Sequence, residues 1–288
     1  MKSSAIVDAL EDLIGIDGAS RDLVGAIVDA LRSKGFDEID ATVLAGQRKA
    51  AIVELIERRQ SKAENAGLIH KLEIFGVLRT EIGGAGKAHP NDDAKIKKAK
   101  QGRRRVEAIL HRLRSLSPPE FELFGAALVR SLGASISEKT RQTGDQGIDF
   151  VGTTRLGDLL EHPKNIFRLA HDMQIDFIGQ AKHYPHRTIQ SATVRELVGS
   201  LELARSRHFS SEKFKLIEDL SLRSFSPVFA LLISTGKISQ GARIVAEKSG
   251  IIVRSGDQIA TYLADLGVGI DSGTGEFAEE SFAEWMGE

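Results

Sequence analysis

The chain has no cysteine and few aromatic residues, with one tryptophan and two tyrosines among 288 residues. Without thiols it can form no disulfide, no thiolate-ligated zinc site and no cysteine nucleophile. It also lacks a long apolar run: the longest, Val228 to Ile233, is six residues, whereas a membrane-spanning helix needs about 20. Acidic residues from Asp8 onward interrupt any secretory signal at the N-terminus. We therefore expect a soluble, cytoplasmic protein without a membrane partner.

Size and charge distribution indicate more than one domain. With 41% hydrophobic residues, the chain is long enough for about two domains with a sizeable core. The net charge is −1, but residues 87–114 contain 10 basic and 3 acidic residues, and residues 261–288 contain 7 acidic residues and no basic one. We expect a mainly helical N-terminal domain over residues 1–114, a second domain over residues 115–268 and an acidic tail over residues 269–288.

The first domain is predicted as helices followed by a loop or small wing. Apolar residues recur at three- and four-residue spacing up to residue 65, and the pattern from Gly67 to Ile82 is short and mixed. The glycine-rich stretch 83–86 then predicts a loop. This loop is not a phosphate-binding P-loop, because Glu81 and Ala88 stand where a glycine and a hydroxyl residue are required. Residues 95–114 predict one basic helix.

The second domain begins at Ser117-Pro118-Pro119-Glu120, which predicts a helix with a capping box. Short β-prone runs follow at 134–138, 148–153, 175–183, 228–234 and 251–254, with helical patterns at 194–207, 239–249 and 258–266. Three successive strands favour antiparallel pairing, and the later alternation favours parallel crossovers. The sequence therefore predicts an α/β fold, a mixed sheet flanked by helices, with a helical excursion at 156–173.

Two of these strands carry polar residues that suit a cation. Asp149 lies at the start of one strand, and Gln180 and Lys182 share a face of another, because side chains alternate along a strand. If the two strands pair, a carboxylate, an amide oxygen and an ammonium group meet at one point. Oxygen ligands suit Mg²⁺, which is usually held by one or two carboxylates together with waters and a substrate phosphate.

These residues belong to a series of motifs in which the chain resembles the Mrr-like restriction endonucleases of the PD-(D/E)xK nuclease superfamily. The resemblance covers residues 118–268. Its motifs, in order, are Phe121-Glu122, residues 144–149 (Gly-Asp-Gln-Gly-Ile-Asp), 180–182 (Gln-Ala-Lys), 194–199 (Val-Arg-Glu-Leu-Val-Gly), 233–236 (Ile-Ser-Thr-Gly) and 251–266. The resemblance implies a restriction-endonuclease-like core with a catalytic site.

The resemblance also implies roles for individual residues. Asp149 and Gln180 look like ligands of Mg²⁺, for which Mn²⁺ can substitute, with the main-chain carbonyl of Ala181 as a third ligand. Lys182 looks like the catalytic lysine. Glu122 looks like the acid of the first helix that supports the metal or its water.

Two departures from the family pattern affect this site. Gln180 stands where the wider superfamily has an acidic residue, so the cation would receive one fewer negative charge. The 31-residue step from Asp149 to Gln180 is also longer than the usual strand connection, and residues 156–173 would have to absorb it.

Plainer interpretations stay open for several residues. Glu122 and Glu196 are also what a helix surface commonly carries, although the resemblance makes Glu196 a further polar neighbour of the site. His183 and His186 have no third ligand at a recognisable spacing, which favours surface histidines. An acidic tail usually serves solubility, although it can also mimic phosphate and cover a basic surface.

The basic segment is the candidate contact with nucleic acid. Phosphate contacts from lysine and arginine supply most sequence-independent affinity for DNA, although a basic run is often only a solvated helix. The residues expected to contact DNA are Lys97, Lys98, Lys100, Arg103, Arg104, Arg105 and His183.

The residues and the resemblance together thus predict a Mg²⁺-dependent endonuclease that hydrolyses phosphodiester bonds of double-stranded DNA, and the resemblance implies a role in restriction of foreign or modified DNA. The N-terminal domain would serve DNA recognition or oligomerisation, and double-strand cleavage with one site per chain favours a homodimer. One alternative is a non-cleaving DNA-binding or defence-sensor module on the same fold. The other is an RNA nuclease or junction resolvase.

Overall fold

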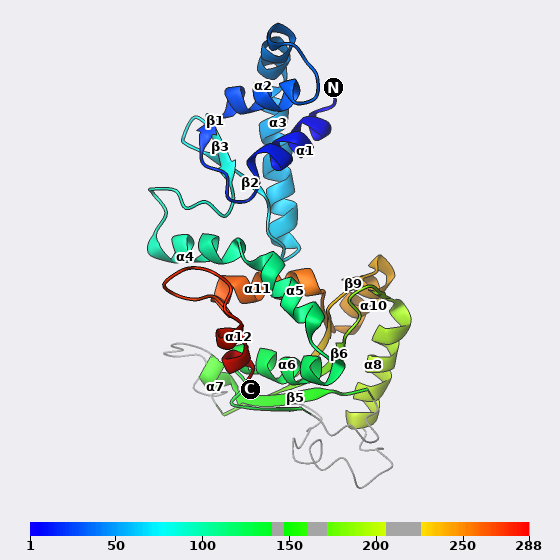
Figure 1. The fold of residues 1–288 in the computed structure, drawn as a ribbon. Helices are drawn as coiled ribbons and strands as arrows, with labels where there is room; N and C mark the ends of the chain where they lie inside the picture. Colours follow the sequence, from blue (N-terminus) through cyan, green and yellow to red (C-terminus); the bar gives the residue numbers. More distant parts are fainter. Residues whose placement is uncertain (140–146, 160–171, 206–225, 288) are drawn as a thin grey trace. The chain divides into compact units, whose positions relative to one another are not determined.

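The computed structural model describes residues 1–139, 147–159, 172–205 and 226–287, which form two compact units (Figure 1). Unit 1 contains Met1–Ile109 and Ala260–Phe282, and unit 2 contains Leu110–Ile259 and Ala283–Glu288. The division falls inside the basic segment, whereas the sequence predicted domain limits at residues 114 and 268. In the part of the chain that is described, no helix is long and apolar enough to cross a membrane.

The N-terminal part of unit 1 combines three helices with a small antiparallel sheet of order β1-β3-β2. Its core includes Leu10, Ile27, Ile52 and Ile82, which are fully buried. The elements are α1 (Ser3–Ile14), β1 (Arg21–Asp22), α2 (Leu23–Arg32), α3 (Glu38–Asn65), β2 (Leu72–Phe75) and β3 (Glu81–Gly84). Three helices followed by a β-hairpin, in this order, resemble a winged-helix arrangement in which the turn between β2 and β3 would be the wing.

The glycine-rich stretch differs from its prediction, because Gly83 and Gly84 lie in strand β3 and not in a loop. A Cβ atom on Gly84 would lie 2.2 Å from the carbonyl oxygen of Ile16, and one on Gly83 would lie 2.9 Å from the Phe75 ring. The glycines therefore allow close approach of neighbouring backbone and an aromatic ring. The loop prediction for these two residues was wrong, since composition does not distinguish a flexible glycine from a closely packed one.

The predicted basic helix is in fact two helices, α4 (Ala94–Arg103) and α5 (Val106–Ser115). At the break, the Arg104 side chain donates to the carbonyl oxygen of Gly86 at 3.0 Å, and that of Arg105 donates to the carbonyl oxygen of Gly275 at 2.9 Å. The partners are 18 and 170 residues away, so local helical periodicity could not reveal the interruption.

The acidic segment also has tertiary structure. Residues Ile270 and Phe277 form an antiparallel bridge, and Glu276 forms an ion pair with Arg105. Helix α12 (Glu279–Met286) follows, and its Phe282 side chain is fully buried. In the segment 269–288, which was predicted as a tail, the described residues are therefore folded, and Phe282 lies in the core.

Unit 2 is built on a five-stranded mixed sheet of order β10-β8-β6-β5-β4. Strands β4, β5 and β6 pair antiparallel, whereas β6, β8 and β10 pair parallel. This arrangement confirms the predicted α/β fold. The strands are β4 (Ile136–Lys139), β5 (Phe150–Arg155), β6 (Gln174–Lys182), β8 (Val228–Ser234) and β10 (Ile252–Arg254). A separate parallel pair is formed by β7 (Thr188–Ile189) and β9 (Lys237–Ile238).

Helices cover the sheet of unit 2. They are α6 (Pro118–Ser131), α7 (Leu156–Leu159), α8 (Ser191–Arg205) and α10 (Gln240–Ser249). Helix α11 (Gly256–Leu266) follows β10 and is divided between the two units. The predicted capping box begins α6: the Ser117 hydroxyl accepts from the Glu120 N–H at 3.4 Å, and the Glu120 carboxylate accepts from the Ser117 N–H at 2.5 Å. Helix α7 covers the start of the predicted excursion at 156–173, and residues 160–171 lie outside the described part.

The packing of α6 decides which face of the sheet is open to chemistry. The Phe150 ring fills the space over two glycines, since a Cβ atom on Gly125 of α6 or on Gly179 of β6 would lie 2.2 or 2.0 Å from that ring. Residues that neighbour Phe150 and Gly179 along their strands therefore point to the opposite face. There, Val194 and Leu197 of α8 pack with Leu232 in a core that also includes α10.

Candidate active site

The pairing of β5 with β6 brings the predicted polar residues together. Phe150 is opposite Gly179 in the antiparallel register, so Asp149 lies beside Gln180. The Asp149 N–H donates to the Gly179 carbonyl oxygen at 2.8 Å, and Asp149 Oδ2 accepts from the Ala181 N–H at 2.7 Å. The Asp149 carboxylate is thus held by the backbone of the same strand that carries Gln180 and Lys182.

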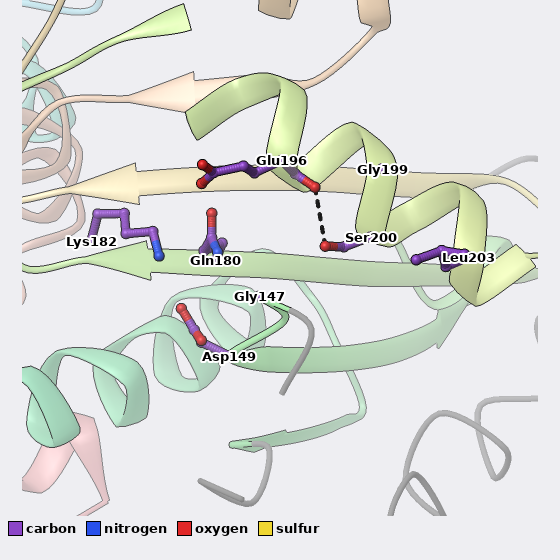
Figure 2. A pocket seen from close by; sticks show the side chains of 8 residues that line it. All are labelled: Gly147, Asp149, Gln180, Lys182, Glu196, Gly199, Ser200 and Leu203. Atoms are coloured by element: carbon purple, nitrogen blue, oxygen red, sulfur yellow. Dashed lines mark hydrogen bonds between the residues drawn. The ribbon is translucent and has the colours of Figure 1, made fainter. Parts of the chain in front are cut away.

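These side chains line one cavity of about 530 Å³, on the α8 side of the sheet (Figure 2). Asp149 and Gln180 are buried, with 7% and 2% of their surface exposed, and Lys182 is partly exposed. Figure 2 shows the Lys182 amine directed toward the Asp149 carboxylate. The lining residues are Gly147, Asp149, Gln180, Lys182, Glu196, Gly199, Ser200 and Leu203.

The amide oxygen of Gln180 is the least satisfied polar atom of this cavity. Gln180 Oε1 is buried and has no hydrogen-bond partner among the described residues. On its other side the amide nitrogen lies against Gly147, where a Cβ atom would be only 2.7 Å from Gln180 Nε2. A buried acceptor without a partner costs about 1–3 kcal/mol. A cation or water in the cavity would remove that cost.

The donor set suits a hard divalent cation. Among the residues that can be described, no cluster of three or more histidine, cysteine, aspartate or glutamate side chains forms a metal cage. Mg²⁺ does not need one, because it is usually bound through one or two carboxylates while keeping several waters and a substrate phosphate. Asp149 and Gln180 supply a carboxylate and an amide oxygen, so the residues present fit such an ion.

Comparison with known families identifies the domain that holds this cavity. Residues 113–209 match the family model Mrr_cat, described as a restriction endonuclease. The chain contains an Mrr-type restriction endonuclease domain. Every residue that lines the cavity falls within the matched segment.

Solved structures and curated proteins add little to this assignment. The restriction endonuclease MspJI in complex with a 27-mer oligonucleotide is 16% identical, with a TM-score of 0.41, over 70% of this chain and 39% of that one. The restriction endonuclease FokI is 13% identical, with a TM-score of 0.37, over 92% of this chain and 44% of that one. The chain thus spans about two fifths of the length of both. No curated protein matches the chain.

The structure does not bring Glu122 into the cavity of the Mrr-type domain. Its carboxylate pairs with the Lys139 amine at 2.7 Å, and that amine also donates to the Pro119 carbonyl oxygen at 3.0 Å. Both side chains of the pair are largely buried, with 22% and 23% exposed. Glu122 is already neutralised, so its support of a metal stays a prediction without a contact in its favour.

The basic residues expected to bind DNA are in large part engaged within unit 1. Lys100 is 3% exposed, and its amine lies 2.7 Å from a Glu73 oxygen and 3.0 Å from an Asp92 oxygen. We withdraw Lys100 from the DNA-contacting set, because a buried and doubly paired amine cannot reach a phosphate. Lys98 is exposed, and Lys97 is partly exposed.

The arginines of the same set have acidic partners. Arg103 pairs with Asp265 at 3.8 Å, Arg104 pairs with Asp17 at 2.8 Å, and Arg105 pairs with Glu276. In unit 2, a ring nitrogen of the sequence-predicted His183 lies 3.2 Å from the Arg114 carbonyl oxygen, and the ring packs edge-on against Phe121. DNA contact by these four residues stays a prediction that would require these bonds to be exchanged for phosphate.

Sequence reasoning predicted the helix that forms the far wall of the cavity and named its Glu196, but it missed two residues of that helix that line the cavity. Ser200 and Leu203 were not singled out, yet they line it together with Glu196 and Gly199. The spacing of three, four and seven residues from Glu196 places them on one face of α8. That periodicity was available in the sequence, but only the packing of Val194 and Leu197 shows which face points to the sheet.

Proposed function

We propose that the chain is a divalent-metal-dependent endonuclease that hydrolyses phosphodiester bonds of double-stranded DNA. The observation that supports this most is the cavity lined by Asp149, Gln180 and Lys182 inside the matched restriction endonuclease segment. In it the Gln180 amide oxygen has no partner among the described residues. We further propose Mg²⁺, replaceable by Mn²⁺, as the cation, and restriction of foreign or modified DNA as the role.

The residues divide the chemistry between them. Asp149 and Gln180 would hold the cation, with the Ala181 carbonyl as a further donor. When bound, such an ion activates water and stabilises negative charge on phosphate oxygens. The Ala181 N–H fixes the Asp149 carboxylate, and the Lys182 ammonium group orients the attacking water and offsets the charge that develops on the phosphate. Water oxygen bonds to phosphorus as the bond to the 3′ oxygen breaks, which leaves a 5′-phosphate and a 3′-hydroxyl group.

A plasmid assay tests this proposal directly. Supercoiled plasmid, methylated or unmethylated, is incubated with the full chain and Mg²⁺ or Mn²⁺, and nicked and linear products are counted. We expect metal-dependent nicking that Asp149→Ala and Lys182→Ala each reduce about 100-fold or more. Lys248→Ala removes an exposed lysine of α10 and serves as the matched control. Absence of nicking by the unaltered chain, or undiminished nicking by Asp149→Ala, would refute the proposal.

One alternative has a specific observation in its favour. The neutral Gln180 leaves the strand motif with a single acid, which suits a DNA-binding or defence-sensor module that no longer cleaves. The same plasmids in a gel-shift assay separate the two, because a sensor retains DNA binding while no metal produces nicks. RNA and four-way junctions belong in the panel, since preferential cleavage of either would identify an RNA nuclease or junction resolvase.

For unit 1 we propose DNA recognition, based on its resemblance to a winged-helix arrangement. Helix α3 carries five basic and five acidic residues, so its own charge does not attract DNA. Recognition would then depend on base or groove contacts more than on phosphate attraction. For the whole protein we propose a homodimer, in which two cavities cut the two strands.

A further inference from the structure

Helix α8 holds a second carboxylate at the cavity. Val194 and Leu197 are fully buried against the sheet and α10, which fixes the rotation of α8 about its axis. Glu196 consequently lines the cavity, and its backbone carbonyl accepts from the Ser200 hydroxyl at 3.0 Å. In the view of Figure 2 the Glu196 carboxylate lies beside the Gln180 amide oxygen, and both residues line the cavity.

The Glu196 carboxylate is available for a ligand. Across the described residues, no ion pair or side-chain hydrogen bond includes it. Glu196 is exposed, whereas the Gln180 side chain that lines the same cavity is 2% exposed, and its acceptor Oε1 has no hydrogen-bond partner among the described residues. Two acceptors cannot satisfy one another, because neither has a hydrogen to donate. A cation between them would satisfy both.

The charges of the cavity point the same way. Asp149 and Lys182 cancel, and Gln180 contributes no charge, so a divalent cation held by these three alone would leave the cavity with a charge of about +2. Buried charge without compensation is unfavourable. A second carboxylate lowers that excess, and Glu196 is the further acid that lines the cavity.

We propose that Glu196 is a metal-binding residue and that it supplies the negative charge that the strand motif lacks at Gln180. The cation lies between α8 and β6, with Asp149 and Gln180 on the strand side and Glu196 on the helix side. This inference rests on the proposed metal dependence, but it assigns a residue from a different element, and it requires α8 to form one wall of the metal site.

Metal binding without DNA tests the inference independently of activity. Mn²⁺ alone is titrated into the full chain by calorimetry, with Glu196→Gln as the test variant and Asp149→Asn as the reference for a lost strand ligand. Glu202→Gln is the matched control, because it makes the same change on the same helix outside the cavity. We expect Glu196→Gln to weaken Mn²⁺ affinity at least about tenfold and Glu202→Gln to leave it unchanged.

A charge relocation sharpens the test. In the double variant Gln180→Glu with Glu196→Gln, the second carboxylate moves from α8 to β6, and we expect most of the lost Mn²⁺ affinity to return. Thermal melts without metal confirm that each variant folds. If Asp149→Asn weakens binding while Glu196→Gln binds as the unaltered chain does, the role of Glu196 is refuted and metal dependence survives. If the unaltered chain binds no Mn²⁺ at millimolar concentration, both are refuted.

Discussion

Replacement of Gly147 by alanine tests whether the backbone before β5 positions the Gln180 amide. Gly147 has a φ of +81°, in the left-handed region where an L-residue costs about 1–2 kcal/mol. The added Cβ would also lie 2.7 Å from Gln180 Nε2 and 3.5 Å from Ser200 Oγ. The amide is an end group and can move, but Gln180 is 2% exposed, so its movement must displace neighbours or redirect Oε1.

The expected effect has two measurable parts. The free energy of unfolding should fall by about 1–3 kcal/mol, from backbone strain and displacement of the amide. For a domain of this size, that is a drop in melting temperature of about 2–4 °C per kcal/mol. Because the amide oxygen shifts with the nitrogen, Mn²⁺ affinity should fall as well.

The control is Gly241→Ala in helix α10, where a Cβ atom meets nothing within 4 Å and φ is not left-handed. There alanine should leave the domain as stable or stabilise it by about 0.5 kcal/mol, because glycine is unfavourable within a helix. Differential scanning calorimetry and Mn²⁺ titration measure both variants. If Gly147→Ala matches Gly241→Ala in melting temperature and metal affinity, the argument that Gly147 holds the amide in place is refuted.

Two further predictions concern stability. Ser117→Ala removes the capping box of α6 and should cost about 1 kcal/mol in urea unfolding. The side-chain hydrogen bond from Ser117, followed by its backbone hydrogen bond, lowers the pKa of Glu120. The part of the stability difference that comes from the side-chain bond should therefore be present above the ordinary glutamate pKa and be lost as the pH falls through the lowered one, whereas the part from the Glu120 N–H bond to the hydroxyl stays. A difference between the two proteins that is constant down to the lowest pH would contradict this. Lys100→Ala leaves the carboxylates of Glu73 and Asp92 unpaired and should destabilise unit 1 by about 3 kcal/mol, whereas Lys98→Ala should not. Equal melting temperatures for the two lysine variants would show that the buried pair contributes nothing.

Much of unit 2 could be predicted because its signals are local. Both hydrogen-bond partners of the capping box, Ser117 and Glu120, lie within four consecutive residues, so the motif can be recognised from the sequence alone. Strand alternation places Gln180 and Lys182 on one face whatever the strand packs against. The prediction that Asp149 lies close to Gln180 and Lys182 needed one further assumption, that β5 and β6 are neighbours in the sheet. Three successive strands favour this, because strands that follow one another commonly pair antiparallel.

The errors share a different cause. Whether Gly84 is a loop or a closely packed strand residue depends on Ile16, which is far away in the chain. Whether Lys100 faces DNA or a buried pair depends on Glu73 and Asp92. Periodicity describes only the residues of one helix or strand, so it cannot identify contact partners that lie elsewhere in the chain.

The amino-acid sequence alone thus determined the order of the main helices and of the five sheet strands in unit 2, its mixed sheet, and the polar residues at or beside two neighbouring strands. Each of these follows from periods of two or 3.6 residues and from short-range hydrogen bonds. Only the tertiary structure decided that α8 places Glu196 in the same cavity lining as Gln180, that the basic segment is interrupted and that the acidic segment is packed. These features depend on contacts between residues that are far apart in the sequence. The free energy of packing comes from many such contacts, and the pattern of residues within one helix or strand does not reveal them.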